Sequence, residues 1–196
     1  MNEAERHFDK INLLSKEIAE EPAVSQSLLL RAIDYYLVQD LEAAMTDLDN
    51  AVSSGNASWE KYFVRSFVRY RLLETLQISD ERNVVLQKHD NYLPNLDYRL
   101  VKDDLDRVLE LRPDFVYAYF NRANVSAKLS DFKSAIVDYT KAIELNDRFA
   151  EAYFNRGLAR IYTGSAEAGV ADLSKAGELG IFQAYNVIKR FAVTVK

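Results

Sequence analysis

Hydrophobic residues recur along this chain with the period of a helix rather than that of a strand. After Asp131, the apolar residues Ala135, Ile136, Tyr139, Ala142 and Ile143 follow one another at helical spacing, which places them on one face of a helix. A second helical stretch is expected just before, over about 116–129, and Asp131 suits the turn and cap between them. The pattern therefore predicts a helix–turn–helix unit.

This helix pair repeats along the chain. Four short segments resemble one another, the first more weakly, and each ends in an arginine. These arginines are spaced by 34, 57 and 34 residues, and an aspartate downstream of each arginine forms a second series spaced by 57, 34 and 34 residues. Both series fit one 34-residue unit with a single insertion of 23 residues, the excess of 57 over 34, placed after Arg65 and before Asp104. The arginines are Arg31, Arg65, Arg122 and Arg156, and the aspartates are Asp47, Asp104, Asp138 and Asp172.

A 34-residue helix–turn–helix period resembles the tetratricopeptide repeat family. The family's pattern has a bulky residue at position 4, small residues at positions 8 and 20, a large residue at 24 and Ala at 27. The stretch 116–149 supplies Tyr119, Ala123, Ala135, Tyr139 and Ala142 at these positions. The resemblance covers about residues 25–179 and implies an all-α fold, a right-handed α-solenoid of helix–turn–helix repeats with capping helices.

We expect six segments in this chain. They are an N-terminal capping helix or remnant of an earlier repeat over 1–24, repeats over 25–58, 59–115, 116–149 and 150–181, and a C-terminal capping helix over 182–196. In the first segment, Phe8, Ile11, Leu14 and Ile18 form an amphipathic stripe. In the last, Lys189, Arg190 and Lys196 suit a solvated outer face.

The insertion is expected within about 73–95, in the second repeat. The first helix of that repeat should run to about Gln77, and Ser79 with Asp80 and Glu81 would then cap a short extra helix. Asp97 would cap the next helix. Loops this long are uncommon unless they are functional or disordered, so a lid, a dimer contact and a decoration of the outer face all remain open.

The recurring arginines and aspartates lie at positions 7 and 23 of the repeat. We interpret them as a structural ion-pair ladder, because a guanidinium forks onto a carboxylate with two parallel hydrogen bonds and so fixes the packing of first helices on second helices. The alternative is that these arginines capture an anionic ligand.

The resemblance also implies a binding surface, because first-helix positions 2, 5, 6, 9, 12 and 13 line the concave face in this family. Here they are aromatic with a track of asparagines, similar to the asparagine ladder of O-GlcNAc transferase repeats. An Asn amide can satisfy an extended peptide backbone, and aromatic walls supply apolar area, unless these rings pack within their own repeat. The candidate groove residues are Phe63, Phe67, Tyr70, Tyr117, Phe120, Asn121, Asn124, Phe154, Asn155 and Tyr162.

The sequence argues against one known binding mode of the family, the carboxylate clamp. The carboxylate clamp for acidic chaperone tails needs Lys and Asn in one repeat, Asn in the next, and Lys and Arg in the one after. The chain has Phe63, Phe67, Asn121, Glu151 and Asn155 there, so only Asn121 matches.

Composition narrows the remaining classes. The chain is 48% hydrophobic with a net charge of -5 and no Cys, and it has no basic cluster or long apolar run, which argues against nucleic acid and membrane insertion. His7 and His89 are expected as single surface residues, without metal-ligand spacing. Residues 164–169 have the two glycines of a phosphate loop but lack its Lys and Ser or Thr. We therefore expect no enzyme, metal or cofactor.

The leading hypothesis is a non-catalytic protein–protein interaction module that binds an extended peptide or partner protein in the concave aromatic and asparagine-lined groove. The alternatives are a scaffold that self-associates as a homo-oligomer and an accessory region of a larger protein. The segment 1–21 is polar and acidic, unlike a secretory signal. A soluble protein in the cytoplasm is consistent with this, as is a periplasmic or exported one from which a signal has been removed.

Overall fold

The computed structural model of the protein describes residues 2–20, 25–55, 57–82 and 97–194, with side chains described to residue 75 of the third stretch and to residue 191 of the last. Within these stretches every regular element is a helix. The chain divides into two compact units, Met1–Leu111 and Arg112–Lys196, named here unit 1 and unit 2. None of the described helices is long and apolar enough to cross a membrane.

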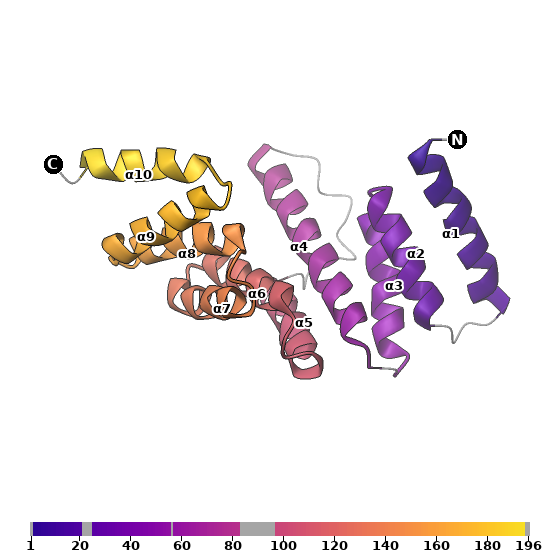
Figure 1. Ribbon diagram of the computed structural model, residues 1–196. Coiled ribbons are helices and arrows are strands. Elements are labelled where there is room, and N and C mark those ends of the chain that lie inside the picture. The colour runs from indigo at the N-terminus through magenta and orange to yellow at the C-terminus, as the bar shows by residue number, and fades with distance from the viewer. Residues whose placement is uncertain (1, 21–24, 56, 83–96, 195–196) are drawn as a thin grey trace. The chain divides into compact units, whose positions relative to one another are not determined.

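Unit 1 is an array in which consecutive helices pack side by side (Figure 1). Its buried cluster joins Leu29 and Ala32 of the second helix, Leu48 of the third, and Val68 and Leu72 of the fourth. The helices are α1 (Glu3–Glu20), α2 (Ser25–Leu37), α3 (Leu41–Ser53), α4 (Trp59–Arg82) and α5 (Tyr98–Leu111).

Unit 2 continues the same alternation of helix and short turn (Figure 1). The side chains of Ala123, Ala135 and Tyr139 form one buried cluster, and Leu173, Ala176 and Ala184 form another further along the array. The helices are α6 (Val116–Lys128), α7 (Phe132–Leu145), α8 (Ala150–Tyr162), α9 (Ala166–Glu178) and α10 (Gln183–Thr194).

In the pairs α2–α3, α6–α7 and α8–α9, the turn between the two helices uses a left-handed backbone residue. Gly164 has φ +87°, as suits a residue without a Cβ. Gln39 and Ser130 hold the same place before α3 and α7 with φ of 66° and 62°, although a side chain makes that conformation unfavourable. Before α3 and α7 the next residue is an aspartate whose side chain caps the helix: Asp40 accepts a hydrogen bond from the backbone N–H of Ala43, and Asp131 accepts one from that of Ser134.

Small residues set how closely the helices approach, as the repeat pattern predicts. A Cβ added to Gly157 in α8 would lie 2.9 Å from the backbone oxygen of Gly169 in α9. α8 and α9 would have to move apart to accommodate this Cβ. Ala123 and Ala135 hold these positions in α6 and α7, and both are fully buried.

α1 differs in part from its prediction. Ile11 is buried and Leu14 and Ile18 are partly buried, as predicted, but Phe8 is 54% exposed. The residue before it, His7, faces α2: its Nδ1 lies 2.6 Å from Asp34 Oδ1, and its side chain is 14% exposed. The prediction of His7 as a surface residue was therefore wrong. The other histidine, His89, lies outside the described residues.

α4 is longer than predicted. It continues to Arg82 rather than ending near Gln77, so Ser79, Asp80 and Glu81 lie within it and do not cap a separate helix. Residues 83–96, which include the rest of the predicted insertion, fall outside the described part of the chain. At the start of α5, the Asp97 carboxylate accepts a hydrogen bond from the backbone N–H of Arg99.

Candidate functional site

The structure brings all eight residues of the predicted ladder together in pairs. In each pair, two nitrogens of one guanidinium lie within hydrogen-bond distance of one carboxylate that is 9% exposed or less. Arg156 Nε and Nη2, for example, both lie 2.8 Å from an oxygen of Asp172. The pairs are Arg31–Asp47, Arg65–Asp104, Arg122–Asp138 and Arg156–Asp172.

The remaining nitrogen of three of these arginines reaches a different helix, the one that precedes the pair. Arg31 Nη1 donates to Ser15 Oγ at 2.9 Å, Arg65 Nη1 to Asp49 Oδ1 at 3.0 Å, and Arg156 Nη1 to Thr140 Oγ1 at 3.0 Å. Each acceptor precedes its arginine by sixteen residues. α1 therefore packs on α2 as a second helix packs on the next first helix.

Two further arginines join the ladder, and sequence reasoning missed them. Arg69 Nη1 lies 2.7 Å from Asp104 Oδ2, and Arg160 Nη1 lies 2.8 Å from Asp172 Oδ2. Both stand one helical turn after a ladder arginine, which is the signal that could have revealed them. Burial raises the pKa of the Asp104 carboxyl, and the hydrogen bonds from Arg65 and the charge of Arg69 oppose the rise.

The guanidiniums are also covered by tyrosine rings. Arg65 lies 5.7 Å from the centroid of Tyr62, and Arg156 lies 5.4 Å from that of Tyr153. Such contacts favour a fixed cation over a ring face. The ladder arginines are thus occupied by carboxylates, rings and neighbouring helices.

The candidate groove residues of unit 1 lie along α4. Phe67 is 41% exposed and meets Tyr36 of α2 edge to face, with centroids 5.2 Å apart. Tyr70 meets Tyr98 of α5 in the same way at 5.7 Å. Burial, together with the Glu74 carboxylate, raises the pKa of Tyr70 to about 12. Phe63 is half-buried, so these rings are partly used within unit 1.

In unit 2, two candidate asparagines form a hydrogen-bonded network across adjacent first helices. Asn124 Oδ1 accepts a bond from Tyr139 Oη at 2.7 Å and another from Asn155 Nδ2 at 3.0 Å. The Asn124 oxygen, which was expected to face a ligand, is therefore already occupied. Asn121 is half-buried, and the described part of the chain offers its side chain no hydrogen-bond partner.

The aromatic candidates of unit 2 divide into buried and open rings. Phe120 packs in the core against Tyr139 and Phe149, with centroids 5.8 and 4.6 Å away, and Phe154 packs partly into the next cluster. Tyr117 is 56% exposed and Tyr162 is 71% exposed.

Each open ring is held by other rings. Tyr117 meets Phe115 and Phe149 edge to face at 5.8 and 5.7 Å, and Tyr162 stacks on Phe132 at 5.1 Å with an angle of 16° between the planes. This packing leaves both tyrosines ordered but accessible. We call the candidates of unit 2 the first-helix face, which consists of Tyr117, Phe120, Asn121, Asn124, Phe154, Asn155 and Tyr162.

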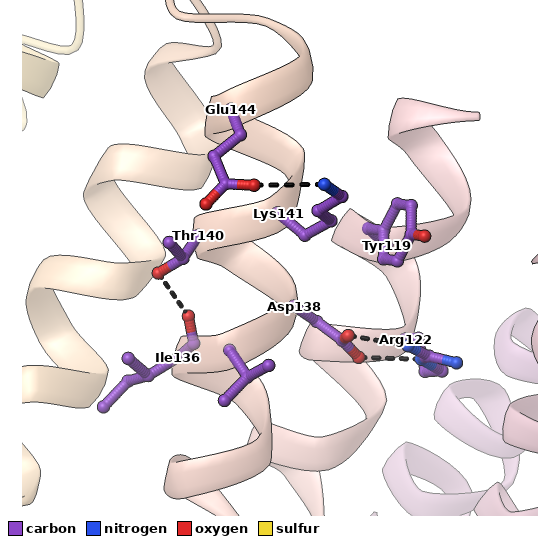
Figure 2. Close-up of a pocket in the computed structure, with 8 residues that line it drawn as sticks. Tyr119, Arg122, Ile136, Asp138, Thr140, Lys141 and Glu144 are labelled. Carbon is purple, nitrogen blue, oxygen red and sulfur yellow. Dashed lines mark hydrogen bonds and ion pairs between the residues drawn. The ribbon is translucent and has the colours of Figure 1, made fainter. Parts of the chain in front are cut away.

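A depression of about 470 Å³ lies elsewhere, across α6 and α7. Figure 2 shows that its polar side chains contact one another: Arg122 pairs with Asp138, and Lys141 Nζ lies 3.1 Å from Glu144 Oε2. Thr140 Oγ1 donates to the Ile136 carbonyl at 2.7 Å. Most polar side chains of this depression are therefore engaged with one another, and Tyr119 Oη donates to the Pro113 carbonyl at 3.1 Å.

No group of three or more His, Asp or Glu side chains among the described residues is arranged to hold a metal ion. His7 is held by Asp34. Residues 164–169 form a turn and the start of α9, not the strand-to-helix connection of a phosphate loop.

Comparison with known proteins supports the fold. Residues 116–149 match the family model described as tetratricopeptide repeat, and no curated protein matches the chain. The solved structure of YrrB, a TPR protein with an unusual peptide-binding site, is similar with a TM-score of 0.76 at 15% identity, covering 94% of this chain and 84% of YrrB.

Structures of MamA are similar as well. One has a TM-score of 0.73 at 20% identity, covering 94% of this chain and 98% of that one. Another, from Desulfovibrio magneticus RS-1, has a TM-score of 0.70 at 16% identity, covering 88% and 85%. The repeat spacing, the small-residue packing, the matched repeat and these folds agree: residues 116–149 form a tetratricopeptide repeat, and the chain has the fold of an α-solenoid built from helix–turn–helix units.

Proposed function

We propose that the protein is a non-catalytic interaction module that binds an extended segment of a partner protein, with the first-helix face of unit 2 as a principal site. The observation that carries this proposal is the network of Asn124, Asn155 and Tyr139, which fixes two amides side by side on adjacent helices. Fixed amides can pair with a peptide backbone at little loss of side-chain entropy.

Two further observations support the proposal. The open rings of Tyr117 and Tyr162 flank these amides along the chain and offer apolar area. YrrB, which has a similar fold, carries a peptide-binding site. The ladder arginines, in contrast, are bound to buried carboxylates, and we propose that they are structural rather than anion-binding.

The test is an affinity capture from lysate of the source organism, read by mass spectrometry. Wild type is compared with an Asn121→Ala, Asn155→Ala variant and with a Val137→Ser control, whose exposed residue lies on α7 away from the first-helix face. We expect a partner retained by wild type and the control and lost by the asparagine variant, with all three shown to be folded by circular dichroism. Equal recovery by all three would refute the first-helix face as the site.

Self-association is the second candidate, and the distribution of charge favours it. Residues 1–111 hold 13 Lys and Arg against 21 Asp and Glu, whereas residues 112–196 hold 12 against 9. An acidic unit in one copy and a basic unit in another attract each other. Light scattering after gel filtration at low and high salt tests this: oligomers that dissociate with salt support it, and a monomer in both buffers refutes it.

A further inference from the structure

The chemistry of the first-helix face indicates which kind of segment it would bind. All seven of its residues are uncharged, and the exposed charged residues at the same repeat positions, Lys128 and Glu151, lie at the ends of α6 and α8 opposite Tyr117 and Tyr162. A charged side chain buried there would lose its hydration without gaining a counter-ion. The face therefore matches a segment that is itself uncharged where it makes contact.

The two open rings stand at equal distances from the asparagine network. Tyr117 precedes Asn124 by seven residues on α6, and Tyr162 follows Asn155 by seven residues on α8. At a rise of ~1.5 Å per residue, each ring lies about 10 Å along its helix from the network. α6 and α8 run in the same direction, because α7 lies between them in sequence and reverses the chain twice.

These positions give the separation of the rings. The hydrogen bond between Asn124 and Asn155 sets those two residues at the same level. The rings are then about 20 Å apart along the helices and roughly 10 Å apart across them, since packed helices have axes 8–10 Å apart. The direct separation is about 20–25 Å.

An extended chain covers that separation with six residues, at ~3.3 Å each, plus the reach of the two side chains. An even number is required, because alternate side chains of an extended chain point to the same side. Between the two ends, the backbone of the segment would pass over the amides of Asn121, Asn124 and Asn155, where the second N–H of Asn155 and the amide nitrogen of Asn124 stay available for its carbonyls.

We infer that the first-helix face takes an extended, uncharged segment of a partner protein with a large apolar or aromatic side chain at each end, six residues apart, anchored on Tyr117 and on the stacked Tyr162. This inference rests on the proposed function and specifies its ligand. Both anchoring residues are exposed, so replacing them should leave the fold intact.

The first part of the test is a selection of random twelve-residue peptides displayed on phage, carried out on the full chain. We expect the enriched sequences to share two large apolar residues six positions apart with no charge between them. Sequences without this spacing, or no enrichment at all, would overturn the inference.

The second part is a double-mutant cycle on one enriched peptide, measured by fluorescence anisotropy. Replacing one anchor of the peptide by Ser should weaken binding about tenfold or more, the effect of losing a buried aromatic contact. On the matching Tyr162→Ser or Tyr117→Ser variant, the same peptide change should then have almost no further effect, whereas on Val137→Ser it should keep its full effect. Additive losses would contradict the assignment.

Competition with the natural partner separates this inference from the proposed function. A captured partner that depends on Asn121 and Asn155 but is not displaced by the peptide would overturn the two-anchor ligand alone. A partner that depends on neither would overturn the proposed function itself.

Discussion

Removing the carboxylate of Asp172 should destabilise unit 2 strongly. Asp172 is 5% exposed and binds both Nε and Nη2 of Arg156 as well as Nη1 of Arg160. An Asp172→Asn replacement keeps the shape but leaves two guanidiniums beside a neutral amide. Removing one partner of a buried ion pair costs ~3–5 kcal/mol, and because Arg160 is 26% exposed, the lower end, about 3 kcal/mol, is expected.

The comparison with a double replacement shows whether the cost comes from unpaired charge. An Arg156→Met, Asp172→Leu variant removes the most buried pair and leaves only Arg160, which is 26% exposed, so it should lose less stability than Asp172→Asn alone. Asp138→Asn is the matched control, because Arg122 is 22% exposed and water can reach it, so about 1–2 kcal/mol is expected there.

Urea unfolding followed by circular dichroism measures the free energy of unfolding of each variant, and hydrogen exchange of α8 and α9 locates the change. A loss under about 1 kcal/mol for Asp172→Asn, or a double variant less stable than the single one, would show that the ladder is not a set of buried charge pairs.

Three further predictions concern packing, backbone and pH. Gly157→Ala should lower the free energy of unfolding, measured in urea, by ~1–3 kcal/mol, because its Cβ would meet the backbone of Gly169. A neutral or stabilising result would contradict the close approach. Ser130→Gly should raise the free energy of unfolding by about 1 kcal/mol, because φ is 62° there, and no gain in thermal or urea denaturation would count against strain at that turn. The pKa of Tyr70 is raised to about 12 in the folded protein, so as the pH rises the unfolded chain loses the Tyr70 proton before the folded protein does. The stability that the protonated phenol contributes is present at pH 9 and is lost between about pH 10 and 12. Wild type should therefore lose ~1 kcal/mol more than Tyr70→Phe over that range, after allowance for partial exposure, and equal losses in urea titrations at pH 9 and 11.5 would refute this.

The repeated helices could be predicted from sequence because their signals are local and periodic. Apolar spacing gave the α7 face, and small residues at the positions of Gly157 and Gly169 gave the close packing. The fork of Arg31 on Asp47 follows from a spacing of 16 residues that recurs in Arg122–Asp138 and Arg156–Asp172. These contacts lie within one helix pair, so the chain order determines them.

The features that were missed depend on contacts between side chains that no spacing encodes. Gln39 and Ser130 take a left-handed conformation that their side chains disfavour, because the packed helices on either side impose it. His7 is partly buried against α2 through its bond to Asp34. The oxygen of Asn124 turns inward to Tyr139, which sequence alone could not separate from an outward orientation toward a ligand.

The third nitrogen of the ladder arginines has a consequence for cooperativity. Because Arg31, Arg65 and Arg156 each donate both within a helix pair and to the helix before it, one side chain contributes to the stability of a pair and to its coupling with its neighbour. In a linear array, these two quantities decide whether ends fray singly or the whole array melts together. An arginine lost from the middle of such an array would separate it into two segments that unfold independently.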